Sequence, residues 1–202
     1  MLTVHHLNKS RSKRVLWLLE ELNMPYQRVD HQRDAQTNLA PASIKAVHPL
    51  SKAPIIVDGD ITLCESSTIM EYILDQDSEQ RLRPAKGTKE YYQYMEWSHF
   101  AEGSLSLPVM CRLFMGMETR SGDQPMDGYI AKEVALDFGY IESILTERDY
   151  FAGAQFTAAD IMMGSMLEIA ANLGLLEGRS KTVAYIKKLQ QRAAYQKAAS
   201  FG

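Results

Sequence analysis

The chain has 202 residues, a hydrophobic fraction of 46%, a charged fraction of 23% and a formal net charge of −3. Mixed charges leave no basic stripe of the kind that binds nucleic acid, and no apolar run approaches the ~20 residues of a membrane span. Cys64 and Cys111 have neither a C-x-x-C nor a zinc-like spacing, so no metal site is expected. Residues 1–6 lack the features of a signal peptide, and a soluble cytoplasmic protein is expected.

The first part of the chain alternates strand and helix signals. A short strand is predicted around Leu2 and Val4. Tyr26–His31 predicts a second strand, with Tyr26 and Val29 as its buried members. Between the two strands, apolar residues at i, i+3, i+4 and i+7 predict one buried face of a helix: Val15, Leu18, Leu19 and Leu22.

A second group of strand signals follows a polar segment. Residues 32–47 show helical potential only in places. Ile55–Val57 and Ile61–Cys64 predict two strands, joined by Asp58–Gly59, a strong hairpin signal because that turn needs positive φ. A helix is then predicted from Ser66. The order β-α-β followed by β-β-α is compact and needs only one right-handed crossover.

Strand signals fade after residues 76–89, which predict a linker. Tyr91–Met117 carry a long helical pattern that is interrupted near Pro108. A loop is predicted at Gly122–Gly128 and a further helix at Ile130–Leu145. The last part of the chain is therefore expected to be all helical.

Two more helices are predicted near the end of the sequence. Thr157 and Asp160 have the spacing of a capping box, with Asp where Glu is more usual. They are expected to stabilise the helix that follows and to touch no ligand. Val183–Ala199 predicts helix again.

Two segments before the third predicted strand could bind a ligand. Ser10 stands between a strand end and a helix start, where a hydroxyl either caps the helix or faces a ligand at its positive end. Pro54 precedes a strand and could hold a cis peptide that turns the backbone of Ala53 outward to pair with a peptide. Lys52 could meet a carboxylate. The alternative for this segment is a surface loop with an edge-strand proline.

A third segment, Cys64–Ile69, passes from a strand end into a helix. The amides of Ser66 and Ser67 would be unpaired donors at a helix N-terminus, and Glu65 would offer a negative charge to an amine. The alternative is an ordinary N-cap. Together the three segments offer partners for a carboxylate, a peptide backbone and an α-amino acid group, which are the features of glutathione.

The sequence closely resembles the cytosolic glutathione transferases over nearly its whole length. One further stretch resembles the branch that includes fungal and bacterial transferases of the yeast type. The stretches that carry the resemblance are Ser10–Leu22 (SRSKRVLWLLEEL), His48–Ile56 (HPLSKAPII), Glu65–Ile69 (ESSTI), Thr157–Ile161 (TAADI) and, for the branch, Tyr94–Ser104 with its Ala101–Ser104 (AEGS).

The resemblance implies a fold of the α/β plus all-α class. A thioredoxin-like glutathione-binding domain is expected at residues 1–79, and an all-helical domain that contributes the electrophile pocket at residues 88–202. Glutathione is the implied co-substrate, with no covalently bound cofactor and no metal. A homodimer is implied as well.

Residue by residue, the resemblance implies that Glu65 and Ser66 bind the γ-glutamyl group. Ala53 matches the residue whose backbone pairs with the cysteinyl unit, Pro54 matches the cis-proline, and Lys52 matches the basic residue near the glycyl carboxylate.

Three further positions follow from the same resemblance. Ser51 stands where the family usually has glycine. Ser10 matches the position that activates the thiol, with Lys9 and Ser12 as alternatives. Glu102 would reach the glutathione amine in the partner subunit.

The implied activity is conjugation of the glutathione thiolate to small hydrophobic electrophiles, a detoxification reaction. Two alternatives remain open: a glutathione-dependent peroxidase or disulfide reductase, and a non-enzymatic interaction module on the same fold. Cys64 is expected to be a small packing residue. An apolar stripe is expected to combine core packing with pocket lining: Met110, Leu113, Phe114, Met115 and Met117.

Overall fold

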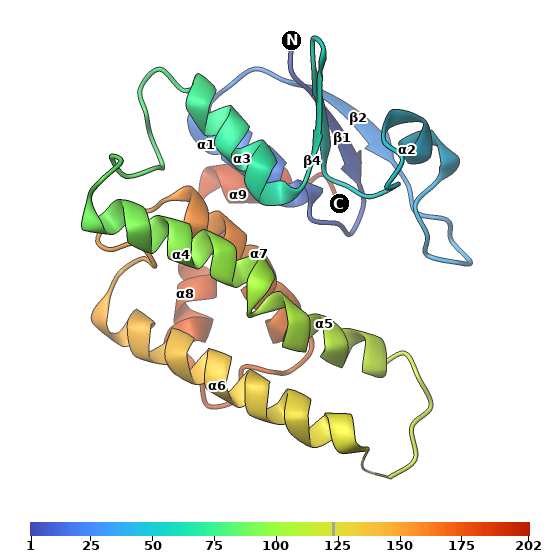
Figure 1. Ribbon diagram of the computed structural model, residues 1–202, viewed down its shortest axis with the longest axis vertical. Coiled ribbons are helices and arrows are strands. Elements are labelled where there is room, and N and C mark those ends of the chain that lie inside the picture. The colour runs from blue at the N-terminus through green and yellow to red at the C-terminus, as the bar shows by residue number, and fades with distance from the viewer. Residues whose placement is uncertain (123) are drawn as a thin grey trace. The chain divides into compact units, whose positions relative to one another are not determined.

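The computed structural model describes residues 1–122 and 124–202. The chain forms two compact units, the first made of residues 1–81 and 191–202 and the second of residues 82–190 (Figure 1). Asp123, in the predicted loop Gly122–Gly128, lies outside the described residues. In the ranges that the structure describes, no helix has the length and hydropathy needed to cross a membrane.

A four-stranded mixed sheet forms the centre of the first unit. Its order is β2-β1-β3-β4, with β1 and β2 parallel and the other pairs antiparallel. This arrangement confirms the predicted thioredoxin-like fold of the N-terminal part. The strands are β1 (Thr3–Leu7), β2 (Gln27–His31), β3 (Ile55–Asp58) and β4 (Ile61–Cys64).

Helices cover both faces of this sheet: α1 (Ser12–Leu22) and α3 (Ser66–Gln76) lie on one side and the short α2 (Ala42–Val47) on the other (Figure 1). The apolar face predicted for α1 is buried, and the helix ends at Asn23, whose φ of 52° is left-handed. In β2 the prediction was wrong in detail, because the buried residue is His31 whereas Tyr26 and Val29 are half-exposed.

The register of the strands brings the ends of all four strands together at one end of the sheet. Ile55, the first residue of β3, pairs with His5 in β1 and with Cys64, the last residue of β4. Leu7 and His31, the last residues of β1 and β2, also pair with each other. The segments that leave β1, β2 and β4 and the segment that enters β3 therefore meet at the same end of the sheet.

The last helix, α9 (Ala193–Ala199), packs against α1. Arg192, just before it, makes two hydrogen bonds of 2.6 and 2.7 Å with the carboxylate of Glu21. The rings of Trp17 and Tyr195 meet edge to face at 5.0 Å. The sequence analysis assigned this segment to the second domain, whereas these contacts place it in the first unit.

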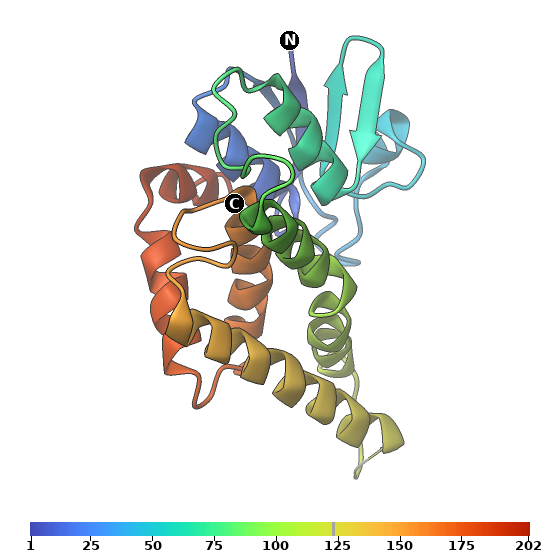
Figure 2. The same cartoon turned by 60° about the vertical axis from the view of Figure 1, so that its left-hand side comes forward.

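Among the described residues of the second unit, the regular secondary structure is all helical, as predicted. α7 lies between α4 and α8 and is buried along nearly its whole length (Figure 2). The helices are α4 (Lys89–Gly103), α5 (Ser106–Met115), α6 (Pro125–Glu147), α7 (Ala158–Asn172) and α8 (Ser180–Gln190).

A proline lies in the first turn of both α5 and α6. The predicted interruption separates α4 from α5, and Pro108 lies in the first turn of α5, where a missing N–H costs no helical bond. The loop predicted at Gly122–Gly128 was too long, because α6 begins at Pro125. The cause is Asp127, whose carboxylate accepts the N–H of Gln124 at 2.8 Å and caps the helix.

The predicted capping box of Thr157 and Asp160 is present at the start of α7. Asp160 is fully buried and accepts hydrogen bonds from Thr157 N at 2.7 Å, from Thr157 Oγ1 at 3.0 Å and from Phe151 N at 2.9 Å. The hydroxyl of Tyr185 donates a fourth. Burial raises the pKa of Asp160, and these four donors oppose the rise.

We predict that Asp160→Ala lowers the free energy of unfolding by about 2–4 kcal/mol, more than the ~1 kcal/mol of an ordinary cap, because it leaves buried donors unpaired. Asp127→Ala is the matched control, since Asp127 occupies the same cap position at a solvent-accessible helix start, and its loss should be clearly smaller. Urea denaturation measures both. A variant of Asp160 with normal stability and strongly reduced turnover would contradict a structural role.

Candidate functional site

The three segments predicted to bind glutathione lie at one end of the sheet. Residues 8–11 follow β1, residues 51–54 precede β3, and Glu65 follows β4. The pairing of Ile55 with both His5 and Cys64 brings these segments together. The register of the strands, and not any single residue, produces this convergence of the three segments.

The loop after β1 is braced by a residue that the sequence analysis missed. Arg33 donates its backbone N–H to Asn8 Oδ1 at 2.8 Å and its Nε–H to the carbonyl of Asn8 at 3.2 Å. Lys9 in the same loop is exposed and has a φ of 53°. Arg33 belongs to a polar segment without periodicity, so the sequence carries no signal for this contact.

Ser10 and Ser12 differ sharply in their surroundings. Ser12 is fully buried, and its Oγ lies 2.8 Å from Nδ1 of His6 and accepts the N–H of Leu7 at 3.2 Å. The N-cap of α1 is Arg11, with no capping side chain. Ser12 therefore neither caps the helix nor faces a ligand. Ser10 is half-buried, two residues ahead of the helix, with its Oγ 2.7 Å from Ser12 Oγ.

The loop before β3 has the predicted cis peptide between Ala53 and Pro54. Pro54 is buried, Ala53 packs against a small core cluster beneath the site, and Lys52 is exposed. Ser51 has a φ of 53° and donates its N–H to the carbonyl of His48 at 3.0 Å. This left-handed backbone is the physical reason why glycine suits the position, and the serine adopts it nonetheless.

Glu65 and Ser66 form the junction between β4 and α3. Glu65 is exposed and has a φ of 75°, a conformation that residues with a Cβ adopt mainly where the structure over-determines it, often at functional sites. Ser66 is the first residue of α3 and is buried. The first amides of a helix have no intrahelical acceptor and carry the positive end of its dipole, so this junction can bind a carboxylate beside the Glu65 charge.

Other predicted residues are also located. Cys64 is half-buried and packs against the same small core cluster as Ala53, in agreement with a packing role. Glu102 is half-buried near the end of α4 in the second unit. Within residues 1–122 and 124–202, no three His, Cys, Asp or Glu side chains lie close enough together to hold a metal ion.

Comparisons with known proteins agree with this geometry. The family model described as "Glutathione S-transferase, N-terminal domain" matches residues 1–75. Glutathione S-transferase 3 of Schizosaccharomyces pombe is 35% identical over 176 residues, which cover 81% of this chain and 72% of the relative.

Solved structures show the same similarity. A glutathione S-transferase from Actinobacillus pleuropneumoniae superimposes with a TM-score of 0.90 at 30% identity, covering 99% of this chain and 92% of that chain. A sphingomonad glutathione S-transferase, solved in complex with glutathione, has the same fold with a TM-score of 0.79 at 24% identity, covering 97% of this chain and 96% of that chain. The chain therefore belongs to the glutathione S-transferase family and is a glutathione transferase.

We predict that Ser51→Gly leaves stability unchanged or raises it by up to about 1 kcal/mol, because the relief of left-handed strain offsets the added freedom of the unfolded chain. Ser143→Gly, in the interior of α6, is the control and should lower stability by about 0.5 kcal/mol. Thermal denaturation compares the two variants. A loss in Ser51→Gly equal to that of the control would contradict the strained conformation.

Proposed function

We propose that the protein conjugates glutathione to small apolar electrophiles. The observation that carries the proposal is the convergence, at one end of the sheet, of an exposed cation, an exposed carboxylate beside a helix N-terminus, and a half-buried hydroxyl. Glutathione complements these groups with a glycyl carboxylate, a γ-glutamyl head and a thiol. The relative solved with glutathione bound supports the same ligand here.

In this proposal Glu65 accepts the α-ammonium of the γ-glutamyl group, and the backbone at Ser66 receives its carboxylate. The backbone of Ala53, followed by Pro54, pairs with the cysteinyl unit. Lys52 attracts the glycyl carboxylate. Each charged group of the ligand thereby meets an opposite charge or dipole, which fixes the position of the thiol between them.

Ser10 donates a hydrogen bond to the cysteinyl sulfur. A thiol with a pKa of ~8.5 is only about 3% thiolate at pH 7. One hydrogen bond to the anion is worth ~1.5–3 kcal/mol, or roughly one to two pKa units, and the N-terminal dipole of α1 contributes up to about one more. These effects make thiolate a major species, and its lone pair then attacks the electrophilic carbon.

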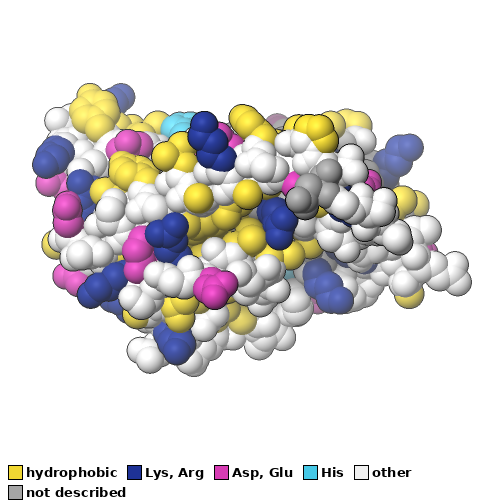
Figure 3. Space-filling model, turned by 90° about the horizontal axis from the view of Figure 1, so that it is seen from below, with side chains coloured by type: hydrophobic (Ala, Val, Ile, Leu, Met, Phe, Trp, Pro, Cys, Tyr) yellow, Lys and Arg dark blue, Asp and Glu magenta, His cyan; other side chains and the backbone are white. Residues whose placement is uncertain are grey.

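The electrophile is held by apolar side chains of the second unit. The stripe that could have been core packing lies at the end of α5 and just beyond it; it contains no buried residue, and Phe114 is 56% and Met117 66% exposed. Figure 3 shows hydrophobic side chains between lysines and arginines on one face of the molecule. The stripe at residues 110–117 is rich in methionine, and soft surfaces of that composition adapt to ligands of varied shape, which supports small hydrophobic substrates.

We propose further that the protein is a homodimer and acts in the cytoplasm. The exposed apolar residues of α5 and α6, among them Leu107 and Leu136, support association with a second copy. Glu102 then contacts the glutathione amine of the partner subunit.

A peroxidase would use the same bound glutathione thiolate with a hydroperoxide as the second substrate. The nucleophile position before α1 carries Ser10, whereas a thiol–disulfide exchanger requires a protein thiolate there. The charged glutathione-binding groups have no purpose in an interaction module. We therefore favour conjugation.

The first part of the test measures turnover with aromatic and α,β-unsaturated electrophiles, organic hydroperoxides and mixed glutathione disulfides. Conjugation should exceed the other activities by at least tenfold in kcat/KM. Higher turnover of hydroperoxides or disulfides would assign the protein to the alternative class, and failure to bind glutathione would favour an interaction module.

The second part tests the glutathione site. Glu65→Gln keeps the side-chain size but removes the charge, so the glutathione Kd should rise about 10- to 100-fold, the equivalent of one charge-assisted hydrogen bond. Glu177→Ala, an exposed carboxylate in the second unit, should leave the Kd unchanged. Titration calorimetry measures both, and equal Kd values in folded variants would remove Glu65 from the site.

A further inference from the structure

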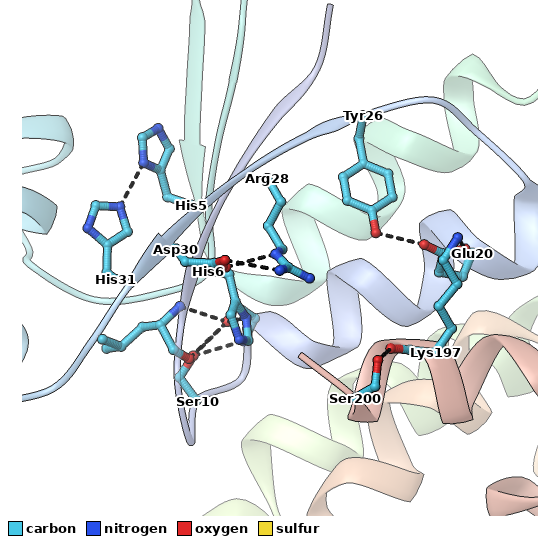
Figure 4. A network of polar contacts seen from close by, with 12 residues as sticks. His5, His6, Ser10, Glu20, Tyr26, Arg28, Asp30, His31, Lys197 and Ser200 are labelled. Carbon is cyan, nitrogen blue, oxygen red and sulfur yellow. Dashed lines mark hydrogen bonds and ion pairs between the residues drawn. The ribbon is translucent and has the colours of Figure 1, made fainter. Parts of the chain in front are cut away.

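A short chain of hydrogen bonds leads from a buried histidine to the hydroxyl of Ser10. His6 in β1 is 1% exposed, and Ser12 at the start of α1 is 0% exposed. Nδ1 of His6 lies 2.8 Å from Oγ of Ser12, which lies 2.7 Å from Oγ of Ser10 (Figure 4). Neither buried group can touch glutathione, so an effect of either on the reaction must act through Ser10.

The lowered pKa of His6 favours the neutral imidazole near pH 7. Burial is the main cause that lowers its pKa, and Arg28 adds to the lowering, while Asp30 and the backbone of Phe201 and Gly202 oppose it. A neutral imidazole has one N–H, on either Nδ1 or Nε2. The position of that hydrogen sets the direction of every hydrogen bond in the chain.

With the hydrogen on Nδ1, the chain runs outward. Ser12 Oγ then accepts from His6 and from the N–H of Leu7, and its own hydrogen goes to Ser10. Ser10 Oγ also accepts the N–H of Ser12 at 3.2 Å, so both of its lone pairs are occupied. The only hydrogen left to direct away from the chain is that of the Ser10 hydroxyl.

With the hydrogen on Nε2, the chain runs inward. Ser12 then donates to Nδ1 of His6, and Ser10 uses its hydrogen on Ser12. Ser10 would then have to give up its hydrogen bond to Ser12 before it could donate to a thiolate. The competing acceptor for Ser12, the carbonyl of Leu7, lies farther away at 3.3 Å.

Two observations favour the outward direction. Nε2 of His6 is buried and makes no hydrogen bond of normal geometry with a described residue, although backbone acceptors of Phe201 and Gly202 lie near the ring. A bare nitrogen lone pair there is less costly than a buried N–H whose nearby acceptors are poorly placed. A thiolate at the site adds to this preference, because an anion is the strongest acceptor available to Ser10.

We propose that His6 and Ser12 are positioning residues that direct the hydrogen of the Ser10 hydroxyl toward the sulfur of glutathione. The proposal rests on the proposed role of Ser10 in thiol activation. It assigns a function to His6 and Ser12, two buried polar residues that do not contact the substrates of the conjugation reaction.

The first experiment determines the tautomer in the wild-type protein. Two-bond ¹H–¹⁵N correlations of ¹⁵N-histidine-labelled protein, with and without glutathione, distinguish Nδ1–H from Nε2–H, and His6→Asn identifies the signal that belongs to His6. The expected result is the Nδ1–H form in the glutathione complex. An Nε2–H form there would reverse the chain and overturn the proposal.

The second experiment measures the thiol pKa of bound glutathione and the pH–rate profile of variants. Ser12→Ala and His6→Leu should raise that pKa by about 0.5–1 unit and lower kcat at neutral pH roughly three- to tenfold. The rate should recover above the shifted pKa, and the KM for glutathione should stay within about twofold. A merely structural loss would not produce this recovery.

Two control variants complete the comparison. His6→Asn keeps an amide N–H near the place of Nδ1 and should retain most of the wild-type pKa. Ser165→Ala removes a buried serine hydroxyl in the second unit and should leave the thiol pKa of bound glutathione unchanged. A thiol pKa in His6→Asn as high as that in His6→Leu would contradict hydrogen-bond donation from His6 to Ser12.

Ser10→Ala, measured in parallel, distinguishes a failure of thiol activation by Ser10 from a failure of the positioning role of His6 and Ser12. If Ser10→Ala leaves the thiol pKa unchanged, the proposed function of Ser10 is wrong. If Ser10→Ala raises the pKa while Ser12→Ala and His6→Leu do not, thiol activation stands and the positioning role alone is overturned.

Discussion

The register of β1, β3 and β4 is the constraint on which the rest of the site depends. Because Ile55 pairs with both His5 and Cys64, three chain segments that are far apart in sequence meet at one end of the sheet. A shift of one residue in either pairing would turn the side chains of that strand to the opposite face and expose Ile55, which is fully buried. Core packing therefore fixes the register, and the register assembles the site.

The backbone at this end of the sheet is unusually constrained. Lys9, Ser51 and Glu65 all have left-handed φ values, one in each of the three converging segments. Such conformations persist only where surrounding contacts impose them, and here the contacts come from Arg33, the carbonyl of His48 and the ends of the strands. The arrangement suits a ligand that is recognised through its backbone and its charges.

Local patterns in the sequence predicted the strands, the apolar face of α1 and the capping box of α7, because each depends on residues close together in the chain, whereas the cis-proline was implied by the family resemblance. The docking of α9 could not be predicted, since Arg192 and Glu21 are 171 positions apart. The burial of Ser12 was also missed, because it depends on His6 in the neighbouring strand. The segments around Lys52 and Glu65 indicated only possible partners for a carboxylate and an amine, and the resemblance to known transferases supplied their proposed roles in glutathione binding.

The central claim is that Ser10, at the end of β1, stabilises the glutathione thiolate. Ultraviolet absorbance of the thiolate against pH, in the glutathione complex of the wild type and of Ser10→Ala, tests it most directly. We expect a thiol pKa of about 6–7 in the wild type and a rise of about 1–2 units in Ser10→Ala, with little change in the glutathione Kd. Identical titrations of the two complexes would contradict it and would assign thiol activation to the backbone amides or to the neighbouring charges of Lys9 and Arg11.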